Sequence, residues 1–204
     1  MLLLEPEGAT SANVSIGDLD GDGDLDIVLA KGRHWPLANQ VLLNDGAGTF
    51  EPRDLGTEPD RTYSSLLADL DADGDLDIVV SNDSPDLKLV YLNDGHGRFA
   101  LGGSWGEAEW NTRNAAVADL NGDGFPDVIA ANRLSASFFC LNDGSGRFPR
   151  DLCVELPSES ATSIVPGDFD GDGAVDLAVP HRDGGQSQVY FNDGKARFDR
   201  KSVV

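Results

Sequence analysis

The residues of this chain that are best suited to chemistry are carboxylates, and they gather in four short runs. The runs read DLDGDGDLD at 18–26, DLDADGDLD at 69–77, DLNGDGFPD at 119–127 and DFDGDGAVD at 168–176. Each run places Asp or Asn at its positions 1, 3, 5 and 9 and Gly at its position 6. Alternating oxygen-bearing side chains, with a glycine that lets the backbone turn sharply, are the arrangement that surrounds a hard cation. The runs therefore predict four cation sites.

Calcium is the cation that this ligand set favours, because Ca²⁺ takes oxygen ligands at about 2.3–2.6 Å in a flexible geometry. Magnesium demands a stricter octahedron, and zinc and copper prefer His or Cys, which the four runs lack. An EF-hand needs a bidentate Glu at position 12, and no run has one. The residues at that position are Leu29, Val80, Ala130 and Val179.

The plainer interpretation is that the acidic runs are only solvated turns. It leaves carboxylates about 5 Å apart, which repel one another by about 3 kcal/mol per pair at an effective dielectric constant of about 20. A plain turn has no need of so many charges. We therefore expect calcium as the cofactor, with up to four ions per chain.

A second motif follows each acidic run and reads NDGAGTF at 44–50, NDGHGRF at 93–99, NDGSGRF at 142–148 and NDGKARF at 192–198. Asn, Asp and Gly tolerate the positive φ of tight turns, so this NDG motif predicts a hairpin. Short apolar stretches after the acidic runs, such as 27–30 and 78–80, predict strands that are buried on both faces. Each repeat then has four strands, two around the acidic run and two around the NDG turn.

Repeats of about 50 residues indicate a solenoid, a propeller or an array, and radially repeated four-stranded units are propeller blades. We therefore predict an all-β fold, a β-propeller built from four blades of about 50 residues each. A helix over Glu107–Asn121 is the local alternative, because this stretch lacks Gly and Pro. The corresponding stretches of other repeats contain Gly17, or Pro166 with Gly167, and these residues break helices. Strand structure is therefore favoured.

We expect a single propeller domain over residues 1–204, with repeats of approximately 1–51, 52–100, 101–149 and 150–199. Residues 200–204 would complete the N-terminal blade, because Val204 falls on the repeat position of Leu4. Two closures stand as alternatives. The four blades close into a four-bladed ring, or two chains pair as a homodimer into an eight-bladed ring.

The pairing of D-x-[DN]-x-D-G-x-x-D with a downstream NDG turn, four times in register, resembles the FG-GAP and VCBS repeat families of integrin α-subunit propellers and many secreted bacterial proteins. Phe-Gly and Gly-Ala-Pro ends are absent, so the likeness to VCBS repeats is the closer one. The resemblance implies calcium loops with side-chain ligands at positions 1, 3, 5 and 9 and a main-chain carbonyl at position 7. The implied side-chain ligands are Asp18, Asp20, Asp22 and Asp26; Asp69, Asp71, Asp73 and Asp77; Asp119, Asn121, Asp123 and Asp127; and Asp168, Asp170, Asp172 and Asp176. The implied carbonyl ligands are Asp24, Asp75, Phe125 and Ala174.

Charge and hydropathy limit the partners. Fifteen Lys and Arg against 36 Asp and Glu leave a net charge of −21, which repels phosphate, so nucleic acid is not expected as a partner. No apolar run approaches the roughly 20 residues of a membrane helix, so membrane insertion is not expected. The segment contains no export signal, and any such signal would lie outside it.

The resemblance implies a non-enzymatic, calcium-binding module, extracellular or at the cell surface, that recognises a protein or glycan ligand through its blade loops. The alternative function is that of a carbohydrate-binding lectin, or of an accessory module of a polysaccharide-degrading enzyme. Three tryptophans in the variable segments bear on this choice, because aromatic rings there stack on sugars or anchor partners; covering a blade edge is nevertheless their favoured role. They are Trp35, Trp105 and Trp110.

Cys140 and Cys153 flank the third NDG turn. Symmetric pairing about this turn would place Cys140 opposite residue 149, which leaves the two thiols too far apart to bridge. We therefore expect Cys140 to pack in the core and the chain to contain no disulfide.

Overall fold

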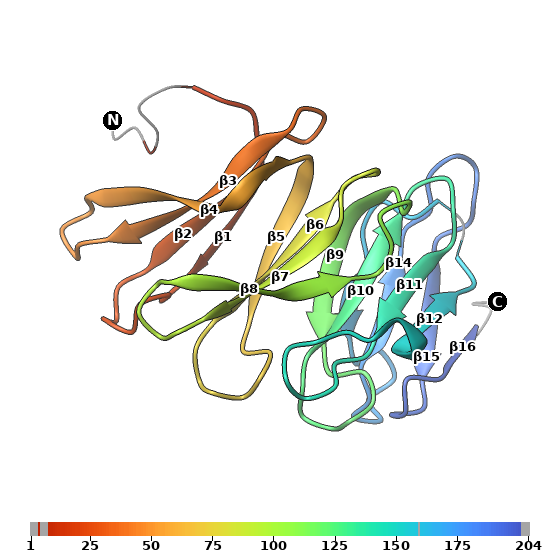
Figure 1. Ribbon diagram of the computed structural model, residues 1–204. Coiled ribbons are helices and arrows are strands. Elements are labelled where there is room, and N and C mark those ends of the chain that lie inside the picture. Colours follow the sequence, from red (N-terminus) through yellow and green to blue (C-terminus); the bar gives the residue numbers. More distant parts are fainter. Residues whose placement is uncertain (1–3, 5–7, 159, 201–204) are drawn as a thin grey trace.

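A computed structural model describes residues 4, 8–158 and 160–200 (Figure 1). The described chain folds into four antiparallel sheets of four strands each. Among these residues there is no α-helix, and the helical segment is a short 3₁₀ turn, η1 (Arg150–Leu152). None of the described helical structure is long and apolar enough to cross a membrane. The prediction of an all-β fold with four four-stranded blades is confirmed.

The strands of each sheet follow one another in chain order. The first blade contains β1 (Ser11–Gly17), β2 (Asp26–Lys31), β3 (Leu37–Asn44) and β4 (Phe50–Asp60). The second contains β5 (Thr62–Ala68), β6 (Asp77–Asn82), β7 (Lys88–Asn93) and β8 (Phe99–Trp105). The third contains β9 (Thr112–Ala118), β10 (Asp127–Asn132), β11 (Ser137–Cys140) and β12 (Cys153–Leu156). The fourth contains β13 (Val165–Gly167), β14 (Asp176–Val179), β15 (Gln188–Asn192) and β16 (Phe198–Arg200).

Both sequence motifs lie at the same edge of every blade, where "edge" means the side formed by the ends of the strands and not an outer strand. The acidic run joins the first strand to the second, and the NDG turn joins the third strand to the fourth. Because neighbouring strands are antiparallel, these two connections meet at one edge, and the connection between the second and third strands lies at the opposite edge. The first strands β1, β5, β9 and β13 contact one another in succession from blade to blade.

The core consists of three apolar layers, each between two consecutive blades. In β6, for example, Val79 packs toward the third blade, whereas Ile78 and Val80 pack toward the first. This alternation follows from the two-residue period of a strand. It explains why each second strand has a continuous apolar stretch after its first aspartate, as expected for strands buried on both faces.

The stretch with helical propensity forms β9, so the helical alternative is wrong. The fourth strands β4, β8 and β12 carry their blades beyond the expected repeat ends at 51, 100 and 149. Arg200 pairs with Tyr190 in the fourth blade. Residues 201–204, which we expected to complete the first blade, lie outside the described residues.

The blades form an arc with the first and fourth blades at its two ends (Figure 1). The exposure of the second residue of each acidic run shows whether a following blade covers it. Leu19, Leu70 and Leu120 are at most 1% exposed, because the next blade covers each of them. Phe169, at the same position of the fourth blade, is 49% exposed. Among the described residues, therefore, no further blade covers the far face of the fourth blade.

Cys140 and Cys153 form a disulfide, contrary to our expectation. In the first, second and fourth blades the Asn of the NDG motif pairs with the Phe six residues later. In the third blade Pro149 and η1 lengthen the connection, so Cys140 pairs directly with Cys153 across β11 and β12. Symmetric pairing was the wrong assumption. Cys140 is fully buried, as expected.

Candidate metal centres

The first aspartate of each acidic run closes its loop by accepting backbone hydrogen bonds. Asp18 Oδ1 accepts from Gly21 N at 2.8 Å, and Asp18 Oδ2 accepts from Gly23 N at 3.0 Å. In the fourth loop Asp168 accepts the equivalent pair at 2.7 and 3.0 Å. Gly23 has a φ of +91°, a conformation that explains the glycine at position 6. The backbone is thereby wrapped around its own carboxylates.

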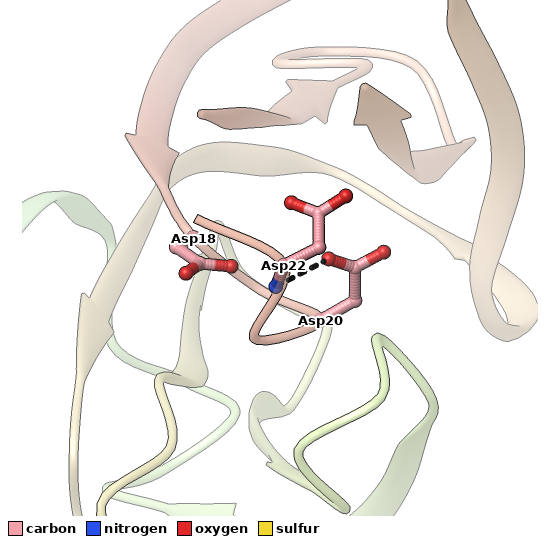
Figure 2. A group of neighbouring side chains, drawn as sticks. All are labelled: Asp18, Asp20 and Asp22. Carbon is pink, nitrogen blue, oxygen red and sulfur yellow. Dashed lines mark hydrogen bonds between the residues drawn. The ribbon is translucent and has the colours of Figure 1, made fainter. Parts of the chain in front are cut away.

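Three loops bring carboxylate oxygens within 4.8 Å of one another. The groups are Asp18, Asp20 and Asp22; Asp69, Asp71 and Asp77; and Asp168, Asp170 and Asp176. Figure 2 shows the first group, in which Asp22 N donates to Asp20 Oδ1 at 3.4 Å. Two oxygens on opposite sides of a Ca²⁺ ion stand about 4.6–5.2 Å apart. The spacing and the all-oxygen donor set therefore fit this ion.

The second loop holds two carboxylate oxygens without hydrogen-bond donors. Asp69 Oδ1 and Asp71 Oδ1 are buried, and neither accepts a hydrogen bond from the described residues. Burial, and next the charge of Asp73, raise the pKa of Asp71 above its ordinary value. In the first loop burial and the neighbouring aspartates likewise raise the pKa of Asp20. A divalent cation at this position would relieve both penalties, because it would replace the missing donors and offset the mutual repulsion.

The ninth residue of each run is fully buried and has both carboxylate oxygens in backbone hydrogen bonds. Asp127 Oδ2 accepts from Leu120 N, and Oδ1 accepts from Asn142 N, both at 2.9 Å. The other three members, Asp26, Asp77 and Asp176, repeat this pair at 2.7–2.9 Å. Burial raises the pKa of Asp77 and of Asp127 to about 6, against the lowering effect of these bonds. The ninth aspartate thus ties the acidic loop to the NDG turn, a role that sequence analysis missed.

The third loop has one carboxylate fewer than the other loops at positions 1, 3, 5 and 9. Asn121 stands where the other loops have a third-position aspartate, and its Nδ2 donates to Asp123 Oδ2 at 2.8 Å. Asp119 closes the loop as Asp18 does, accepting from Gly122 N at 2.7 Å. An asparagine oxygen is also a calcium ligand, so the residues of this loop fit the ion as well.

At position 7 the side chains lie against the NDG turn of the same blade. A Cβ at Gly46 would clash with the Asp24 carboxylate, and a Cβ at Gly95 would clash with the Asp75 carboxylate. The two other residues at this position, Phe125 and Ala174, lie beside the corresponding glycines. These side chains are thus directed to the turn, which leaves the main-chain carbonyl as the group that position 7 can offer a cation.

The NDG asparagine links its own blade to the preceding one. Asn93 Nδ2 donates to Leu19 O in the first blade at 2.8 Å and to Leu76 O in its own blade at 3.1 Å. Asn142 and Asn192 repeat both contacts. We call this pair of hydrogen bonds the interblade clamp. The recurrence of the asparagine in the sequence could have indicated it, but the NDG motif was interpreted only as a turn.

Two of the three tryptophans are structural. Trp105 is 1% exposed and donates its Nε1 proton to Val80 O at 3.2 Å. Trp110 stacks on Phe138 with ring centroids 4.3 Å apart. Both rings pack in or against the apolar layer between the second and third blades, while Trp35 is 68% exposed.

Solved structures share this fold. A lectin of Agrocybe aegerita that recognises non-reducing terminal N-acetylglucosamine superposes with a TM-score of 0.58 at 23% identity, covering 90% of this chain and 49% of that one. BBS1N, solved in complex with ARL6DN, gives 0.57 at 13% identity, covering 95% and 57%. The V. cholerae biofilm matrix protein Bap1 gives 0.51 at 18% identity, covering 97% and 32%. This chain thus spans about half of the first two structures and a third of the last.

No match to a curated protein sequence was found. The profile described as "FG-GAP-like repeat" matches residues 18–80, 69–130 and 119–179, which together span most of the chain. Each match begins at the first aspartate of an acidic run and ends in the second strand of the following blade. The chain belongs to the FG-GAP-like repeat family.

Proposed function

We propose that the chain is a calcium-stabilised, non-enzymatic propeller module that recognises a ligand outside the cell. The observation that carries the calcium role is the pair of buried oxygens, Asp69 Oδ1 and Asp71 Oδ1, which lack donors within a cluster of carboxylates. At extracellular affinities of about 10⁻⁴–10⁻³ M and roughly millimolar calcium, each site contributes about 0.4–1.4 kcal/mol to stability. Four sites then contribute a substantial part of the roughly 5–15 kcal/mol that stabilises a domain.

Isothermal titration with calcium tests this assignment. We expect binding of more than one ion per chain, weaker binding of magnesium, and loss of one site in Asp71→Ala. Ser145→Ala is the matched control, because its exposed hydroxyl belongs to an NDG turn and not to an acidic run. Equal heats for wild-type protein and Asp71→Ala would contradict the assignment.

The contrast between the two ends of the blades supports recognition of a protein or glycan ligand. The acidic loops and NDG turns are alike in every repeat, while the connections at the opposite edge differ in length and sequence. Loops that vary on a rigid scaffold are the usual place for binding residues. Fold alone assigns no ligand, so the ligand class needs its own observations.

Carbohydrate binding is the second candidate, and exposed Trp35 favours it, because a free indole face can stack on a sugar ring. The likeness to the Agrocybe aegerita lectin, whose ligand is N-acetylglucosamine, supports it by analogy only. A glycan array with wild-type protein and Trp35→Ala tests it. Binding that disappears in the variant supports a lectin, and binding that is unchanged contradicts a role for this residue.

A second copy of the chain is the proposed partner of the open ends. In the second blade Leu67 and Leu76 pack against the first blade, where a Cβ at Gly17 would lie 2.6 Å from Leu76 Cδ1. The same repeat positions in the first blade are Ile16 and Leu25, and each is 60% exposed. The first blade therefore presents the apolar surface that a preceding blade would cover.

The fourth blade presents the complementary surface, with Gly167 at the repeat position of Gly17 and exposed Phe169 beside it. Two copies related by a twofold axis would form two such interfaces and close an eight-bladed ring. Light scattering should then give twice the chain mass of 21.6 kDa. Leu25→Asp should yield a monomer, whereas Leu134→Asp, at a 71% exposed position, should not. A monomeric wild-type protein would contradict the pairing.

A further inference from the structure

A basic depression lies in this strongly acidic chain, at the blade edge opposite the acidic loops. Its volume is about 540 Å³, and its lining includes Arg33, Arg113, Arg133 and Arg182 together with His34. Among the described residues that line it there is no Asp or Glu. With 15 basic against 36 acidic residues in the chain, such a gathering is not a sample of the average surface.

All four blades contribute to this arginine pocket, as we name the depression lined by these residues. Arg33 follows β2, Tyr63 lies in β5, Arg113 lies in β9, Arg133 follows β10 and Arg182 follows β14. These positions are at the ends of the strands that point away from the acidic runs, since Ser11 pairs with Lys31 at one end of the first hairpin and Gly17 with Asp26 at the other. The pocket and the metal centres are therefore separate sites.

The neighbouring carboxylates do not balance the guanidinium groups. Asp83 pairs with Arg113 at 2.6 Å, and both side chains are largely buried. Asp183 serves two arginines at once, with its oxygens 4.0 Å from Arg133 Nε and 4.0 Å from Arg182 Nε. Two carboxylates thus face three guanidinium groups.

Arg33 adds a further positive charge. Among the described residues Arg33 forms no ion pair with a carboxylate, and its guanidinium lies 5.6 Å from the ring centre of Tyr63. The guanidinium of Arg113 lies 4.5 Å from the same ring centre, and the Tyr63 hydroxyl is 3.1 Å from His34 Nδ1. Tyr63 therefore holds two guanidinium groups close together, at a cost in repulsion that a bound anion would remove.

Two buried donors in this region have no acceptor. The Nε atoms of Arg113 and Arg133 are buried, and neither donates a hydrogen bond to the described residues. A guanidinium fork binds a carboxylate or a sulfate through paired N–H groups, so Nε–H donors that make no hydrogen bond, beside an excess of positive charge, suit a planar anionic group.

From these contacts we infer that the arginine pocket binds an acidic sugar unit, one that carries a carboxylate among hydroxyl groups. The anionic group accounts for the arginines, and the hydroxyl groups account for the rest of the lining, which includes Asn13, Ser64, Asn114 and Thr162. The volume lies in the range of small-ligand sites, about 300–1,000 Å³. An extended polyanion is disfavoured, because the net charge of −21 repels it outside the pocket.

This inference rests on the proposed recognition function and names the class of its ligand. Titration calorimetry with digalacturonate, with neutral galactobiose as the matched ligand, tests it with calcium present throughout. We expect digalacturonate to bind, to weaken as salt is added, and to lose at least about tenfold in affinity in Arg33→Gln and in Arg182→Gln. Both arginines are exposed, so neither substitution disturbs the core.

Arg98→Gln is the control variant, because Arg98 is a 77% exposed arginine at an NDG turn, on the opposite edge of the blades. It should bind digalacturonate as the wild-type protein does. An equal loss in Arg98→Gln, or equal binding of both sugars, would overturn the inference; in the second case carbohydrate recognition itself would stand. Preference for a glutamate peptide over digalacturonate would also overturn it, in favour of an acidic protein ligand.

Discussion

Asn142 reaches across 72 residues of sequence to donate a hydrogen bond of 2.8 Å from its side-chain amide to the carbonyl oxygen of Leu70. Leu70 is the second residue of an acidic run, and Asn142 begins the NDG turn of the following blade. The acidic loop of one blade and the hairpin of the next are therefore parts of one hydrogen-bonded unit. This contact joins an acidic loop directly to the neighbouring blade.

Asn142→Ala should destabilise the protein by about 3 kcal/mol, because it removes the bonds to Leu70 O and Pro126 O and leaves Gly144 N and Gly146 N without their acceptor. Denaturant unfolding measures this change. Ser145→Ala, an exposed hydroxyl in the same turn, should cost less than about 0.5 kcal/mol. Equal midpoints for the two variants would argue against the clamp.

Asp127→Ala and Asp123→Ala should differ in how they depend on calcium. Asp127 is fully buried and satisfies two backbone N–H groups, so its loss should cost about 3 kcal/mol even in excess chelator. Asp123 is an exposed loop carboxylate, so its loss should matter only when calcium is present. Unfolding curves of both variants in calcium and in EGTA provide the comparison. If the Asp127→Ala variant were as stable as the wild-type protein in EGTA, Asp127 would not anchor the acidic loop to the NDG turn.

Reduction of the Cys140–Cys153 disulfide should lower the free energy of unfolding by about 3 kcal/mol, since the bridge closes a loop with a sequence separation of 13. Unfolding with and without dithiothreitol measures the effect. Cys153→Ala is the control, because it removes the bridge at the partly exposed end and should make stability insensitive to the reductant. Reductant sensitivity that persists in this variant would contradict the assignment.

Asp60, at the end of β4, provides a pH-dependent contribution that is separate from the metal centres. Burial raises its pKa from 3.8 to about 6. The folded protein then holds the carboxyl proton of Asp60 more tightly than the unfolded chain does. The contribution of Asp60 to stability therefore falls as the pH rises from 3.8 to about 6. Asp60→Asn should raise the melting temperature at pH 7.5 and leave it nearly unchanged below pH 4. The same difference at both pH values would show that ionisation of Asp60 is not the cause.

The sequence was sufficient to predict the blade count and the strand order, because each repeat carries both connecting motifs in register. The disulfide escaped prediction because η1 shifts the pairing of β11 with β12, and the hairpin motif carries no sign of that shift. The interblade clamp escaped because turn chemistry already accounted for Asn142.

The arginine pocket was hidden for a different reason. Arg133 and Arg182 occupy the same repeat position, and their backbone N–H groups donate equivalent hydrogen bonds to Asn111 O and Ser160 O. Arg33 and Arg113 occupy two other repeat positions. Comparison of repeats finds residues that recur, and these four meet only because the blades bend around a common depression.

Thermal unfolding in calcium and in excess EGTA is the most direct test of the central claim, that the acidic loops hold ions which stabilise the arc of blades. The free energies of calcium binding, added over the four loops, predict a melting temperature about 5–15 °C higher in millimolar calcium than in EGTA. Magnesium should give a smaller shift. An identical melting temperature in calcium and in EGTA would contradict the account.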